Sequence, residues 1–140
     1  EAVAPDVGRV FTFKLGADGN VPEPMMSNVV KSPKAKPFGD AATIQAGFIH
    51  YSENCMLCHG PLAISSGVLP DLRWSFMAAD KDDWHDIVID GALTDAGMVS
   101  FKPNLSPEDA QAIRAYVLDQ AWLAVANGDA VEPSADDLED

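Results

Sequence analysis

The spacing of hydrophobic residues between positions 38 and 127 predicts an all-α domain with three main helices. The first helix is expected to begin after Asp40, which can cap it, and to run to about Asn54. One face carries residues at helical spacing, namely Ile44, Gly47, Phe48, Tyr51 and Cys55. We therefore expect this face to be turned toward the core.

The second helix is predicted to start after Asp80 and to stop before Gly91, a residue suited to the C′ position. The residues of its inner stripe are Trp84, Ile87, Val88 and Gly91. The segment from 60 to 79 that precedes this helix is loop-like, with Gly67 and Pro70 as turn residues.

The third helix has the clearest start, with Ser106 as N-cap and Pro107 at N1. It is expected to end near Asn127, before Gly128. The predicted inner face consists of Ile113, Tyr116, Val117, Gln120 and Ala124. We expect Tyr116 to meet Gly47 where the first and last helices cross, because glycine allows two backbones to approach.

The two ends of the chain differ from this helical region. Residues 1–37 are predicted to be an N-terminal arm or linker: Val10 to Leu15 alternates like a short strand, and four prolines and two glycines follow. Residues 128–140 hold six acidic and no basic residues and are predicted to be a disordered tail. The domain proper is thus expected at 38–127.

The charge of the chain excludes some partners. Acidic residues outnumber basic ones 22 to 9, a net charge of −13, and the excess lies after residue 37, where 18 acids face four bases. A field of this sign repels nucleic acid and anionic membrane surfaces. No apolar run approaches the roughly 20 residues that span a bilayer. We expect the acidic surface to favour a basic or neutral partner.

The chemistry is concentrated in the run Cys55-Met56-Leu57-Cys58-His59. This C-x-x-C-H pattern is typical of covalent haem attachment, in which two thiols form thioethers and the following imidazole binds the iron. A thioredoxin-like redox pair is the first alternative, but such a pair follows a strand. Half of a zinc site is the second, but His50 and His85 have poor spacing for it.

The stretch from Gly47 to Gly60, G-F-I-H-Y-S-E-N-C-M-L-C-H-G, resembles the first helix and haem motif of class I cytochromes c. Further likeness covers 67–73, 87–93, 97–101 and 105–117. More narrowly, the chain resembles the C-terminal cytochrome domain of pyrroloquinoline quinone (PQQ)-dependent quinohaemoprotein alcohol dehydrogenases. The resemblance implies three to five helices around one covalent haem c, with an extended N-terminal arm whose residues 8–15 end a PQQ propeller.

A second axial ligand is expected opposite His59. Met56 lies inside the motif, and Met77 adjoins a helix start. Met98 lies in a loop before the last helix, and the family's axial methionine matches this position. We therefore predict His59 and Met98 as the iron ligands. The alternatives are a core role for Met98 and His85 as ligand.

Three more residues are predicted to support the haem. The resemblance implies that the carbonyl of Pro70 accepts a hydrogen bond from the His59 imidazole, although Pro70 is also a good turn residue. Arg73 and Trp74 can each pair with a haem propionate, and the alternatives are a solvated arginine and a core aromatic. The predicted apolar shell is Leu57, Leu69, Leu72, Trp74, Ile87 and Val88.

These features predict one-electron transfer and no catalytic residues in this chain. The resemblance implies that electrons come from a PQQ propeller domain, tethered or docked, and pass to a soluble redox protein, a membrane oxidase or quinone. It also implies a periplasmic location, and a start at Glu1 fits cleavage or excision. A free-standing carrier cytochrome is the first alternative. A five-coordinate haem used for sensing or peroxidase chemistry is the second.

Overall fold

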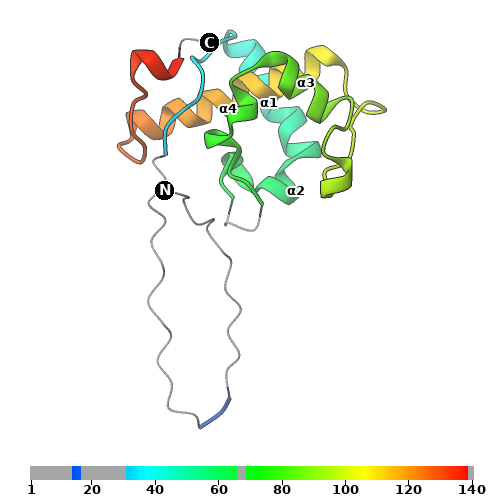
Figure 1. The fold of residues 1–140 in the computed structure, drawn as a ribbon, viewed down its shortest axis with the longest axis horizontal. Coiled ribbons are helices and arrows are strands. Elements are labelled where there is room, and N and C mark those ends of the chain that lie inside the picture. Colours follow the sequence, from blue (N-terminus) through cyan, green and yellow to red (C-terminus); the bar gives the residue numbers. More distant parts are fainter. Residues whose placement is uncertain (1–13, 17–30, 66–68, 139–140) are drawn as a thin grey trace.

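A computed structural model of the chain describes residues 14–16, 31–65 and 69–138, and within them it is helical, without strands (Figure 1). The α-helices are α1 (Ala41–Asn54), α2 (Met56–His59), α3 (Lys81–Val88) and α4 (Pro107–Ala126). Five short 3₁₀ turns connect or follow them: η1 (Pro61–Ala63), η2 (Leu72–Trp74), η3 (Phe76–Ala78), η4 (Thr94–Ala96) and η5 (Ala135–Leu138). The all-α prediction is confirmed.

The crossing of α1 and α4 forms the centre of the fold. A Cβ atom at Gly47 would lie 1.9 Å from the carbonyl oxygen of Ala112 and 2.9 Å from the Cβ of Tyr116. The aromatic rings of Tyr51 and Tyr116 pack beside this contact, with centroids 5.2 Å apart. The predicted approach of Gly47 and Tyr116 is therefore confirmed, because only a residue without a side chain fits there.

Local hydrogen bonds account for the starts of the longer helices. Asp40 accepts from the Thr43 amide at 2.8 Å, and Asp80 accepts from the Asp82 amide at 2.6 Å. The start of α4 is a capping box: the Ser106 hydroxyl accepts from the Asp109 amide, and the Asp109 carboxylate accepts from the Ser106 amide. All three predicted starts are confirmed.

The end of α3 differs slightly from the prediction. The helix ends at Val88 with Ile89 as its C-cap, so the C′ position belongs to Asp90, and Gly91, predicted for that position, lies one residue further on. Gly91 nevertheless has a left-handed φ of +76°. A Cβ atom at Gly91 would also clash with Ser100, so the absence of a side chain there allows the loop that follows α3 to pack against the end of the helix.

The predicted helix faces are only partly correct. Phe48 of α1 is 42% exposed, while Ile44, Ile87 and Gln120 are half-buried. The central helix α4 is buried on several sides, because it packs against α1, α3 and the 3₁₀ turns. Its buried residues are Ala110, Ala112, Ile113, Ala115, Tyr116, Val117, Leu118, Ala121 and Ala124. A single stripe does not describe such a helix.

Residues 31–37, predicted as linker, pack onto the domain instead. Pro33 is fully buried, and the Trp122 indole nitrogen donates to the Ala35 carbonyl oxygen at 2.9 Å. In Figure 1 this segment (cyan) runs beside the end of α4 (orange) and the C-terminal turn (red). The physical reason is that both contacts are tertiary: the Pro33 ring is buried in the domain, and the Ala35 carbonyl accepts from a side chain of α4.

The tail also differs from its prediction of disorder. The Val131 amide donates to the Lys31 carbonyl oxygen at 2.8 Å, and the amide and hydroxyl of Ser134 both donate to the Asp137 carboxylate of η5. The predicted strand at 10–15 lies mostly outside the described residues, and Leu15 is in an exposed turn. None of the helices in the described ranges is both long and apolar enough to span a bilayer.

Candidate haem-binding site

The attachment motif begins where α1 ends. Cys55 caps α1 and starts α2, and the amides of Cys58 and His59 both donate to its carbonyl oxygen, at 3.1 and 2.9 Å. Positions i, i+3 and i+4 share one face of a helix, so this single turn presents both thiols and the imidazole together. Both cysteines are free thiols, Cys55 buried and Cys58 exposed.

The properties of Cys55 argue against a thiol–disulfide redox pair. Desolvation by burial, followed by the nearby Cys58, raises the pKa of the Cys55 thiol to about 12. Redox-active cysteines instead have a lowered pKa and lie after a strand at a helix N-terminus. The zinc alternative receives no support, since the described residues contain no group of three or more His, Cys, Asp or Glu side chains placed to hold a metal ion.

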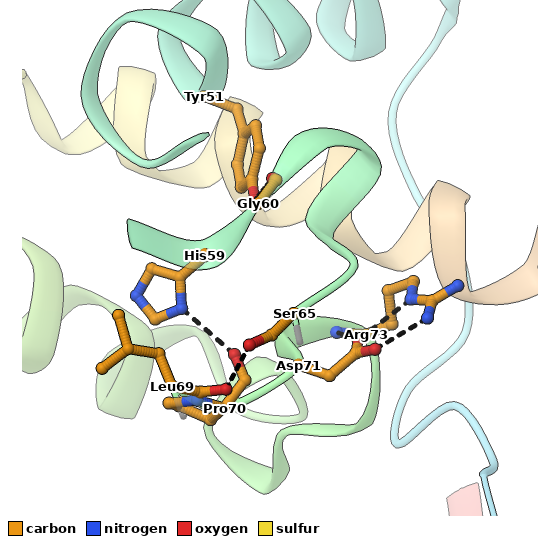
Figure 2. A network of polar contacts seen from close by, with 8 residues as sticks. All are labelled: Tyr51, His59, Gly60, Ser65, Leu69, Pro70, Asp71 and Arg73. Atoms are coloured by element: carbon orange, nitrogen blue, oxygen red, sulfur yellow. Dashed lines mark hydrogen bonds and ion pairs between the residues drawn. The ribbon is translucent and has the colours of Figure 1, made fainter. Parts of the chain in front are cut away.

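His59 is buried and its orientation is set by one contact. Its Nδ1 lies 3.1 Å from the carbonyl oxygen of Pro70, and Figure 2 shows the other ring nitrogen pointing away from this contact. Because a carbonyl only accepts, Nδ1 is assigned as the protonated nitrogen, which leaves the Nε2 lone pair free for a metal. The predicted His59–Pro70 contact is present, and the role of His59 as iron ligand remains a proposal.

Two hydrogen bonds fix the chain on either side of His59. The Tyr51 hydroxyl donates to the Gly60 carbonyl oxygen at 2.7 Å, which ties the end of α2 to α1 (Figure 2). The Ser65 hydroxyl donates to the Leu69 carbonyl oxygen beside Pro70. From the sequence Tyr51 was placed only on the inner face of the first helix and Ser65 was not singled out, since neither belongs to the attachment motif.

Arg73 has a partner that the sequence analysis missed. Its guanidinium donates to both carboxylate oxygens of Asp71, at 2.9 and 2.7 Å, and lies 4.8 Å from the Trp74 ring centroid. Arg73 is thus not a freely solvated arginine. The Asp-x-Arg spacing was the signal that could have revealed this pair. Its pairing with a propionate stays a prediction.

Trp74 carries an unpaired donor. Its Nε1 is buried and has no hydrogen-bond partner among the described residues. A buried indole N–H without an acceptor costs free energy, and such groups are rare in folded proteins. This orphaned donor therefore fits an acceptor supplied by a bound group, such as a carboxylate.

Met98 lies half-buried in the loop between α3 and α4 and packs against the core. His85, the alternative ligand, has its Nε2 3.5 Å from an Asp90 carboxylate oxygen, and Met77, which was set aside from the sequence, is 43% exposed. His50 forms a similar contact at 3.2 Å with Asp109. Among the methionines that the structure describes, Met98 is the one we propose for the iron.

The predicted apolar shell is buried only in part. Leu72 and Val88 are buried, and Trp74 and Ile87 are half-buried, whereas Leu69 is 41% exposed and Leu57, at 97%, is a surface residue. The reason is the helical turn of α2, which directs the residues between the two cysteines away from the rest of the chain. Large apolar side chains beside the predicted ligands, Leu69 and Val99, are also exposed and suit contact with an apolar group.

Taken together, the donors fit a covalently held haem. The chain offers two free thiols, an imidazole with Nε2 available, a loop thioether and an orphaned N–H suited to a carboxylate. Sulfur and imidazole are ligands that iron accepts in haem proteins.

Comparison with known proteins supports the same chemistry. Residues 42–117 match a family model described as cytochrome C oxidase, cbb3-type, subunit III. The chain is 38% identical over 114 residues to the dehydrogenase subunit of a quinone alcohol dehydrogenase from Gluconobacter oxydans, covering 81% of this chain and 15% of that protein. It is 37% identical over 91 residues to cytochrome c550 of Pseudomonas aeruginosa, covering 61% of this chain and 62% of that protein.

A solved structure shows the same fold. The chain aligns with the quinohemoprotein alcohol dehydrogenase ADHIIG of Pseudomonas putida at a TM-score of 0.62 and 33% identity, covering 83% of this chain and 16% of that one. The chain thus spans about a sixth of the length of the alcohol dehydrogenases that it matches.

Proposed function

Since this chain belongs to the family described as cytochrome c oxidase, cbb3-type, subunit III, a family of cytochromes c with covalent haem c, we propose that it relays single electrons from a PQQ-dependent dehydrogenase domain to an external acceptor. The observation that carries the proposal is the single turn that holds both thiols and His59, with Nδ1 of His59 bonded to Pro70.

The haem supplies an iron that gains and loses one electron. Cys55 and Cys58 hold the group on the polypeptide, and His59 binds through Nε2. The Pro70 carbonyl keeps the imidazole in one tautomer and makes it a stronger ligand. A thioether from Met98 raises the reduction potential. The buried side chains of Leu72 and Val88 would exclude water from the haem. Without water, the extra positive charge of the oxidised iron is disfavoured.

The donor is inferred from the relatives. Several carry the words alcohol dehydrogenase (quinone) or quinohemoprotein in their names, and this chain matches about a sixth of their length. The chemistry on the alcohol is therefore assigned to a preceding PQQ domain and electron relay to this chain. The acceptor proposed is a soluble redox protein, a membrane oxidase or quinone, and the location is the periplasm, where thioether attachment takes place in this family.

The proposal is tested on the chain matured with haem. We expect the haem to stay on the polypeptide after denaturation, the oxidised form to be low-spin with the far-red charge-transfer band of methionine ligation, and reduced PQQ dehydrogenase to reduce it by one electron. Cys55→Ala with Cys58→Ala should release the haem. A high-spin spectrum that changes readily with carbon monoxide would instead indicate a five-coordinate sensor or peroxidase.

A second candidate is a free-standing periplasmic carrier. It is favoured by the match to cytochrome c550, because this chain covers 62% of that protein but only 15–16% of the dehydrogenases. An antibody against this chain separates the two in the source cells. A band several times larger than 14.9 kDa supports the tethered domain, whereas a band near 14.9 kDa with a matching transcript supports the carrier.

A further inference from the structure

The loop that carries Met98 is closed at its base. Its two ends are joined by three successive contacts: the Phe101 amide donates to the Val88 carbonyl oxygen at 2.9 Å, the Ser100 hydroxyl to the Ile89 carbonyl oxygen at 2.5 Å, and the Lys102 ammonium to the Asp90 carboxylate at 3.1 Å. We call this set of contacts the neck of the loop. It fixes the distance between Met98 and the end of α3.

Within the loop, Met98 is attached to its neighbours. Its amide donates to the Leu93 carbonyl oxygen at 3.2 Å, and the Thr94 hydroxyl donates to the Gly91 carbonyl oxygen at 2.7 Å. Because these bonds run inside the loop, we expect the backbone of residues 91–98 to move as one piece. Moving the backbone of Met98 away from the core as one piece with the loop therefore requires the neck to loosen.

Ser100 is the centre of the neck. Its hydroxyl donates to Ile89 and also accepts from the Lys102 amide at 3.3 Å, so one side chain joins both ends of the loop. The approach is possible because Gly91 has no side chain: a Cβ there would lie 2.9 Å from the Ser100 Cβ. The Lys102–Asp90 pair is exposed and contributes little by comparison.

We propose that Ser100 is a positioning residue for Met98, and that its hydroxyl keeps the loop closed against competing iron ligands. The inference rests on the proposed function, in which Met98 binds the iron. An added ligand can take that place only when the loop is open, so its apparent affinity is reduced by the fraction of open molecules. Loss of the Ser100 bond should increase that fraction.

The experiment is imidazole binding to the oxidised, haem-loaded chain. One hydrogen bond corresponds to about a three- to tenfold change in an equilibrium, so Ser100→Ala should raise the apparent imidazole affinity about three- to tenfold. Ser100→Thr, which keeps the hydroxyl, should bind like the wild type. Ser52→Ala is the matched control, because Ser52 also donates to a backbone carbonyl, that of Phe48, at 2.7 Å but on α1. It should leave the affinity unchanged.

A second background separates the inference from the proposed function. In Met98→Ala the iron position is open already, so adding Ser100→Ala should have no effect. If Met98→Ala keeps the far-red band, the ligand assignment fails and the inference fails with it. If Met98→Ala abolishes the band but Ser100→Ala binds imidazole like the wild type, or Ser52→Ala gains as much affinity, only the role of Ser100 is wrong.

Hydrogen exchange tests the same idea without a variant. With saturating imidazole, the Phe101 amide of the neck should exchange with solvent faster, while the amides of α4 should stay protected. A Phe101 amide that remains protected with imidazole bound would show that the loop need not open, and would overturn the proposal.

Discussion

The indole nitrogen of Trp122 donates to the carbonyl oxygen of Ala35 across 2.9 Å, joining residues that are 87 positions apart. This bond ties the segment that enters the domain to the last turns of α4. Residues 31–37 are therefore fixed on the domain beside the folded tail.

Replacing Trp122 with Phe should loosen that segment. The Ala35 carbonyl would lose its donor, and one hydrogen bond contributes about 1 kcal/mol to the free energy of unfolding. We expect a lower midpoint in urea and faster tryptic cleavage at Lys31 and Lys34. Unchanged cleavage at these lysines would show that the segment is held by other contacts.

Replacing Trp74 with Phe should change the pH dependence of the reduction potential. If its orphaned N–H donates to a haem propionate, it favours the ionised form and lowers the pKa of that propionate. The ionised propionate stabilises oxidised iron, so the potential falls as pH rises through this pKa. In Trp74→Phe this fall should move to higher pH in potentiometric titrations.

The control for this variant is Trp122→Phe, which also removes an indole N–H but far from the attachment motif in sequence. Its potential should follow the wild-type pH curve. Superimposable curves for Trp74→Phe and the wild type would assign the Trp74 donor to another acceptor.

Replacing Gly47 with Ala should strongly destabilise the fold. The added Cβ would lie 1.9 Å from the backbone carbonyl of Ala112, so the two helices must separate. Overpacking of this kind costs about 1–3 kcal/mol or more. Denaturant unfolding should show the loss, whereas Gln45→Ala on the exposed face of α1 should change stability little. Equal stability of Gly47→Ala and the wild type would contradict the crossing.

Stability should fall below about pH 4 through the helix caps. Hydrogen bonds from backbone amides hold the pKa of Asp40, Asp80 and Asp109 below its usual value. A lowered folded pKa gives stability that is present above the unfolded pKa and is lost as pH falls through the folded one. Asp80→Asn, which can still cap, should flatten this acid dependence of unfolding.

Asp86→Asn serves as the control for the cap, since it alters an exposed aspartate of the same helix that caps nothing. In this variant the free energy of unfolding should fall at low pH as steeply as in the wild type. If the pH dependence flattens equally in both variants, the effect comes from net charge and not from the cap.

Electron exchange with charged reagents should depend on salt. The chain has a net charge of −13, and α3 exposes Asp82, Asp83 and Asp86. Attraction between opposite charges is screened by ions, so the oxidation rate with a cationic reagent should fall with ionic strength and that with an anionic reagent should rise. Stopped-flow rates that are flat for both reagents would remove charge as a docking feature.

Much of the fold could be predicted because its signals are local. Asp40, Asp80 and Ser106 cap their helices through amides two or three residues away, and such bonds can be inferred from residue order alone. The attachment motif is local in the same sense, because one helical turn brings its three groups together. The crossing at Gly47 was also predicted, since a glycine on an inner face implies a close neighbour.

The sequence by itself thus determined the three longer helices, the attachment motif and the candidate ligands. Only the tertiary structure decided how distant segments combine: the docking of residues 31–37 on α4, the Arg73–Asp71 pair beside Trp74, and the neck that Ser100 forms with Ile89. The physical reason is that helix caps and periodic faces depend on residues within one or two turns. Contacts between loops depend on the path of the backbone, which is set by packing over the whole chain.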